Sequence, residues 1–140
     1  MTQTVALVPL VMKNPHIELG GEEYDKSCSS ATLTPNAVVV TWDGFGDAQI
    51  ADVGTVTWTL DLILAQDQTT ADSLQGFLND PANIGTKVPF EVRPTGTTGK
   101  GYSGEVLVIP VPIGGAKGVV ATATVSLAVV GQPTPIAAGA

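Results

Sequence analysis

Apolar and polar residues alternate along much of the chain, most clearly over residues 55–65. Apolar side chains take every second position there, which is the two-residue period of a strand with one buried face. The apolar set is Val56, Trp58, Leu60, Leu62 and Leu64, and the facing set is Thr55, Thr57, Thr59, Asp61 and Ile63. Further strands are predicted at residues 5–12, 16–19, 37–42, 87–93, 102–109 and 119–130. Both tryptophans, Trp42 and Trp58, are expected in the core.

One segment has a helical period instead. Residues 70–79 place Leu74 and Leu78 on one helical face, with Thr69 as the expected N-cap and Asp80-Pro81 as the stop. We therefore predict one helix in a chain that otherwise reads as strands and turns.

Two segments interrupt the strand pattern. Residues 20–35 are polar and longer than an ordinary connection, so they are predicted to be a long functional loop that is mobile in the free subunit. Residues 131–140 are rich in Pro, Ala and Gly and are predicted to be an extended C-terminal arm. The order of elements predicts one domain over residues 1–140, a mainly β chain folded as a β-sandwich with one flanking helix.

Composition supports the β assignment and restricts the partners. The 140 residues include 18 Val and 17 Thr, both of which favour strands. The net charge is −7, and residues 18–80 carry 11 acids against one base. Binding to a nucleic-acid backbone by charge neutralisation is therefore excluded. No apolar run is long enough to cross a bilayer, so no membrane partner is expected.

Candidate chemistry is sparse. The single histidine, His16, cannot supply a multi-histidine zinc site, and the single cysteine, Cys28, cannot form a disulfide within the chain. The acids Asp43, Asp47 and Asp52 lack the spacing of a calcium loop. We expect His16 at the surface and Cys28 as an unreactive loop thiol, and we predict no metal, no cofactor and no enzymatic activity.

A glycine-rich stretch at residues 99–106 matches the phosphate loop of protein kinases. The lysine, catalytic-loop and magnesium-binding motifs that give this loop its function do not accompany it. Glycines at residues 96–101 and 114–118 are therefore interpreted as the tips of hairpins.

The ordered features resemble a known family. They are the strand 58–67, a short helix ending at 74–78, the segment 85–90, a glycine-rich hairpin leading into 102–108, and the closing stretch 121–133. In this order they resemble the major tail protein, or tail tube protein, of long-tailed bacteriophages.

The resemblance implies a β-sandwich that forms hexameric rings, which stack into a hollow tube. It implies assembly in the host cytoplasm, a place in the virion tail, and contacts with the tape-measure, tail terminator and tail-tip proteins. DNA would pass through the tube without specific binding, and the acidic surface of this chain agrees with a conduit.

Two sets of residues are predicted to serve that assembly. One strand face rich in hydroxyl groups is expected to line the lumen: Thr55, Thr57, Thr59, Asp61, Thr122, Thr124 and Ser126. The early loop is expected to contact the next ring: Gly21, Glu22, Glu23, Tyr24, Asp25 and Lys26. The alternatives are a tail terminator or head decoration protein, or an adhesion or carbohydrate-binding sandwich with exposed aromatic residues.

Overall fold

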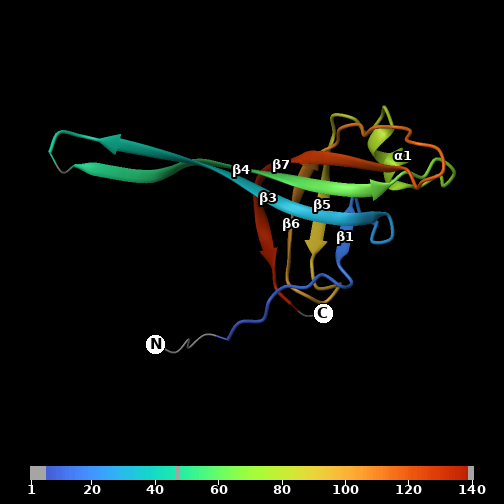
Figure 1. Cartoon of the computed structure of the whole chain (residues 1–140), viewed down its shortest axis with the longest axis horizontal. Coiled ribbons are helices and arrows are strands. Elements are labelled where there is room, and N and C mark those ends of the chain that lie inside the picture. The colour runs from blue at the N-terminus through green and yellow to red at the C-terminus, as the bar shows by residue number, and fades with distance from the viewer. Residues whose placement is uncertain (1–5, 47, 139–140) are drawn as a thin grey trace.

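The computed structural model describes residues 6–46 and 48–138 and shows a mainly β chain, as predicted (Figure 1). Its strands form one antiparallel sheet in the order β2-β1-β5-β6-β7-β4-β3. They are β1 (His16–Leu19), β2 (Glu22–Glu23), β3 (Cys28–Asp43), β4 (Gln49–Ala65), β5 (Lys87–Arg93), β6 (Gly101–Leu107) and β7 (Thr122–Ile136). The helix α1 (Leu74–Asn79) lies between β4 and β5.

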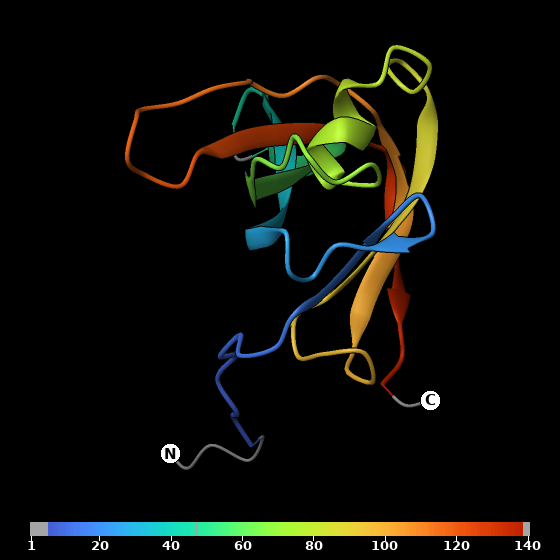
Figure 2. The same cartoon turned by 90° about the vertical axis from the view of Figure 1, so that its right-hand side faces the viewer.

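The sheet bends at β7, which belongs to both of its halves. Residues 122–128 of β7 pair with β4, whereas residues 129–136 pair with β6. Gly131, at a φ of 81°, lies where the β6–β7 register shifts, a backbone conformation that glycine adopts without a steric penalty. The strands on the two sides of the bend run in clearly different directions (Figures 1 and 2). The seven strands thus form one continuous sheet that is folded at β7, and the sandwich arrangement stays a prediction.

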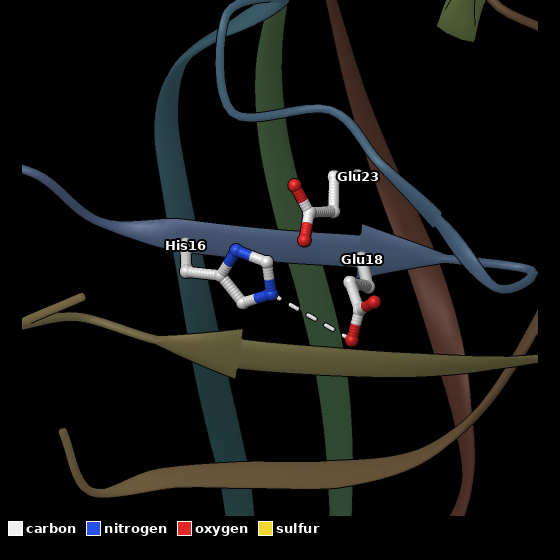
Figure 3. A group of neighbouring side chains, drawn as sticks. All are labelled: His16, Glu18 and Glu23. Carbon is white, nitrogen blue, oxygen red and sulfur yellow. Dashed lines mark ion pairs between the residues drawn. The ribbon is translucent and has the colours of Figure 1, made fainter. Parts of the chain in front are cut away.

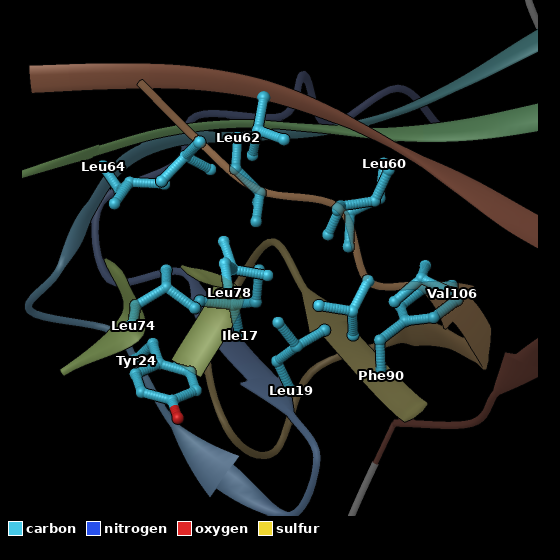
Figure 4. Packing of buried hydrophobic residues seen from close by; sticks show 14 of the residues in the cluster. Ile17, Leu19, Tyr24, Leu60, Leu62, Leu64, Leu74, Leu78, Phe90 and Val106 are labelled. Atoms are coloured by element: carbon cyan, nitrogen blue, oxygen red, sulfur yellow. The ribbon is translucent and has the colours of Figure 1, made fainter. Parts of the chain in front are cut away.

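The core lies between the two halves of the sheet and under α1 (Figure 4). The alternation at residues 60–64 is confirmed, because Leu60, Leu62 and Leu64 are fully buried. Leu74 and Leu78 of α1 are buried as predicted.

The helix is shorter than predicted because a turn takes up its expected first residues. The carboxylate of Asp67 accepts hydrogen bonds from the backbone N–H groups of Thr69 and Thr70, both at 3.0 Å. Ser73 is the N-cap instead of Thr69, and its Oγ accepts a hydrogen bond from the Gly76 N–H at 3.1 Å. The local side-chain bonds of Asp67 thus compete with the helix.

The prediction of a long loop at residues 20–35 is wrong. This segment contains β2 and the first eight residues of β3, and Tyr24 between them is 7% exposed within the core cluster. The length and polarity of the segment predict a loop, because the apolar pattern of a strand with one buried face is missing there. The ladder with β4 nevertheless runs from Cys28↔Leu64 outward.

The predicted C-terminal arm is also largely strand. β7 continues to Ile136, which pairs with Gly101, and Pro133 is buried. At the other end of the chain, the described residues 6–12 of the strand predicted at 5–12 form no strand, and residue 5 lies outside the described residues. The remaining predicted strands are present, with 87–93 matching β5 in full.

Candidate functional site

The most unusual feature of the molecule is the outer half of the β3–β4 hairpin. β4 pairs with β7 only from Thr59 onward, so the hairpin continues beyond that point as a two-stranded ribbon that projects from the body (Figure 1). We call its described residues, 36–46 and 48–57, the arm. The arm ladder runs from Asn36↔Thr57 to Asp43↔Gln49, and the Gly44 N–H donates to the Ala48 carbonyl at 2.7 Å near the tip.

The arm exposes apolar side chains on both faces. Val39 is 62% exposed, Trp42 67% and Ile50 63%, and Phe45 at the tip is fully exposed. The prediction that Trp42 lies in the core is therefore wrong, and Trp58 at the base of the arm is only half-buried. Exposed large apolar side chains gathered on one element are typical of an interaction site.

The backbone of the arm is also left open. β3 is the last strand in the sheet order, so its outer edge pairs with no described strand. The sequence of residues 36–57 has three aspartates and no lysine or arginine. Lysine is one of the residues that protect exposed edges against pairing with another chain, and the arm has none. Both its side chains and its edge are therefore open to a partner.

The predicted lumen residues fall into two groups. Thr59, Asp61, Thr122, Thr124 and Ser126 share the outer face of the β3–β4–β7 part of the sheet, opposite the buried leucines. Thr55 and Thr57 lie on the arm instead.

Asp61 is the centre of this hydroxyl face. Its carboxylate accepts hydrogen bonds from Thr34 Oγ1 at 2.8 Å and from Ser126 Oγ at 2.6 Å, which link β3, β4 and β7. Asp61 thus has a structural role within the subunit that the sequence did not reveal, because Thr34 lies in a segment interpreted as loop.

The predicted inter-ring residues are only partly available to another ring. Gly21, Glu22, Glu23 and Lys26 are exposed, but Tyr24 is buried. The Asp25 carboxylate accepts a hydrogen bond from the Ile17 N–H at 2.7 Å and contacts His16 Nδ1 at 3.0 Å. The loop is therefore held to the body through both Tyr24 and Asp25.

His16 is buried, contrary to the surface position expected. Burial lowers the pKa of His16, but the hydrogen bond and charge of Asp25, together with the charge of Glu18, outweigh it and raise the pKa above its usual value. His16 lies 3.6 Å from Glu18 through its Nε2 atom (Figure 3).

Glutamates surround this histidine. Glu18 pairs in register with Glu23 on one side and with Glu91 on the other. The hydrogen bond with Glu91 and burial raise the pKa of Glu18, whereas that bond and the ion pair with Arg93 lower the pKa of Glu91. The sequence predicted both strands, but its pattern does not show that β1 and β5 are neighbours.

Cys28 lies at the start of β3 and not in a loop. Burial and the charge of Asp25 raise the pKa of its thiol to about 11, so it is protonated near neutral pH. A thiol in this state is a poor nucleophile and a poor metal ligand.

No protein-family model matches this chain, and a search of curated proteins finds no similar sequence. Among the described residues, no helix has the length and apolar character needed to span a membrane.

Proposed function

We propose that this protein is a structural subunit that polymerises, as stacked hexameric rings, into the tail tube of a long-tailed bacteriophage. The observation that carries the proposal is the arm, which exposes large apolar side chains on both faces and lies before Leu60, the first core residue of β4. Because an isolated two-stranded hairpin is only marginally stable in water, we expect another molecule to stabilise an arm of this length.

In this proposal the arm of one copy binds the body of the next copy, which is a head-to-tail contact. An apolar hollow lies near the base of the arm, lined by Leu10, Met12, Leu33, Trp58 and Tyr102. A projecting element that binds a different surface of an identical copy makes a heterologous interface, which closes into rings or continues as a filament. The number six, the stacking and the tail partners come from the family resemblance alone.

The hydroxyl face and the charge agree with a conduit for DNA. In this proposal the Thr59–Asp61 face of β4 lines the lumen, and short hydroxyl side chains there make no counterion-releasing contacts with phosphates. The tape-measure protein fills the tube during assembly, and terminator and tip proteins bind its ends.

A second candidate is a binding module that uses exposed aromatic residues, such as an adhesion or carbohydrate-binding domain. The exposure of Trp42 and Phe45 favours it. Such a module binds its ligand as a monomer, whereas a terminator or decoration protein would form a single ring or a surface knob.

Electron microscopy of the purified protein, alone and with tail-tip initiator proteins, tests the proposal. We expect tubes or stacked rings for the native chain and their loss in the arm variant Val39→Thr/Ile50→Thr. The matched control is Val119→Thr/Val120→Thr, which changes apolar groups before β7 that are at least as exposed as Val39 and Ile50, and it should still assemble. A chain that stays monomeric at millimolar concentration with initiators, or an arm variant that assembles like the control, would contradict it.

A further inference from the structure

The edge of the sheet farthest from the arm has an unusual row of like charges. Glu23 of β2, Glu18 of β1 and Glu91 of β5 lie side by side in register. Like charges directly opposite one another on neighbouring strands are destabilising. Arg93 pairs with Glu91, but among the described residues no lysine or arginine forms an ion pair with Glu18 or Glu23.

A buried imidazole faces this row. The side chain of His16 is only 5% exposed, and its Nδ1 contacts the Asp25 carboxylate at 3.0 Å. Asp25 itself is fixed by the Ile17 N–H. With a proton held on Nδ1 by this carboxylate, the lone pair of Nε2 is available to a metal ion. Figure 3 shows Nε2 on the side of Glu18, to which a dashed line marks the ion pair.

Nε2 forms an ion pair with Glu18 when His16 is protonated. Its nearest acidic oxygen, Oε2 of Glu18, lies at 3.6 Å, which is too long for a hydrogen bond. This separation is close to the spacing of two ligands on one ion, because two atoms about 2.1 Å from a tetrahedral zinc lie about 3.4 Å apart. Ligand atoms of His16, Glu18 and Glu23 all lie within 4.8 Å of one another.

We propose that His16 Nε2, Glu18 and Glu23 bind one divalent transition-metal ion, with Zn²⁺ as the reference ion and water completing the coordination. The Nδ1–H···Asp25 contact is the carboxylate–histidine arrangement that orients metal-binding imidazoles in other proteins. An imidazole ligand favours zinc and its neighbours over Ca²⁺ or Mg²⁺, which prefer oxygen ligands throughout. The bound ion neutralises the glutamates and ties the two-residue strand β2 to β1. This site does not depend on the proposed tail-tube function.

Equilibrium dialysis of tag-free protein, first treated with a chelator, tests the site in monomer and assembly alike. We expect about one Zn²⁺ per chain at micromolar free zinc, and much weaker uptake of Ca²⁺ and Mg²⁺. Glu23→Gln should weaken zinc binding at least tenfold. Glu22→Gln is the matched control, because it makes the same charge change at an exposed neighbour that is not in the cluster.

The single histidine gives a second readout. Because His16 is the only imidazole in the chain, its nitrogen resonances in an NMR spectrum need no assignment by mutation. Zinc should move the Nε2 signal far more than the Nδ1 signal. The proposal would be overturned if the protein bound no stoichiometric zinc at 100-fold the micromolar free zinc used in the dialysis, or if the two glutamate variants had equal zinc affinities. It would also be overturned by equal uptake of Ca²⁺, or by an Nε2 signal that responds to protons but not to zinc.

Discussion

The inner and outer halves of the β3–β4 hairpin both alternate apolar residues with threonine and other polar residues, but they have opposite surroundings. Both halves belong to one antiparallel ladder and contain threonine, but the apolar residues of the outer half are mostly Val and those of the inner half mostly Leu. In the inner half, β7 adds a third strand and the core covers Leu60, Leu62 and Leu64. In the outer half, Val39 and Ile50 are mostly in solvent.

The difference shows that strand propensity and burial are separate properties. β-branched residues favour the extended conformation in both halves, but only the inner half receives the free energy of burying apolar surface within the subunit. The outer half keeps its apolar residues without that stabilisation. We infer that the burial of these residues comes from another molecule.

The largest expected effect is a difference in subunit stability between substitutions of two aliphatic residues of β4. Leu62→Ala removes a fully buried side chain and should lower the free energy of unfolding of the isolated subunit by about 2–5 kcal/mol. Ile50→Ala, 12 positions away on the arm, should change it by less than about 0.5 kcal/mol. Urea unfolding of both variants measures the difference. A loss of similar size at Ile50 would mean that the arm is packed within the subunit.

A smaller effect is expected for two aspartates of β4. Asp61→Ala removes the acceptor for Thr34 and Ser126 and should cost about 1–2 kcal/mol. Asp52→Ala on the arm removes only a contact with the adjacent Val53 N–H and should cost less than about 0.5 kcal/mol. Thermal melts of the two variants at equal protein concentration compare them. Equal losses of stability in the two variants would show that the hydrogen bonds of Asp61 with Thr34 and Ser126 do not stabilise the subunit.

The smallest effect concerns the turn that follows β4 at the body end. Hydrogen bonds from Thr70 and Thr69 lower the pKa of Asp67 to about 2, below the ordinary value of 3.8. Because the pKa of Asp67 is lower in the folded chain, its ionised carboxylate stabilises the folded state at pH values above 3.8. This contribution to stability is lost as the pH falls through about 2. Asp67→Asn should therefore melt slightly below the native chain at pH 6 and together with it near pH 2. A gap in melting temperature that persists at pH 2 would assign the effect to packing.

The sequence predicted those parts of the fold that depend on local pattern. The period at Leu60, Leu62 and Leu64 and the bounds of β5 were correct because one buried face imposes alternation. The start of α1 was wrong because Asp67 and Ser73 redirect the backbone bonds of its expected first turn.

The candidate site depended on relations that the sequence pattern does not contain. Trp42 was expected in the core because aromatic residues usually are buried, and alternation alone cannot show whether a covering layer exists. His16 and Glu91 become neighbours only through the β1–β5 pairing. Five of the seven predicted lumen residues share one face of the body, whereas Thr55 and Thr57 lie on the arm, and the place of this face in a lumen stays a prediction.

Hydrogen exchange of the arm amides, in the isolated subunit and in the assembled state, tests most directly whether a neighbouring copy covers the arm. In the isolated subunit we expect fast exchange over residues 36–57, because a two-stranded ribbon opens readily, and slow exchange at Leu60, Leu62 and Leu64. On assembly, the arm amides should become protected by at least tenfold while those of the core stay unchanged. Arm amides that exchange equally fast in the assembled state would contradict the account.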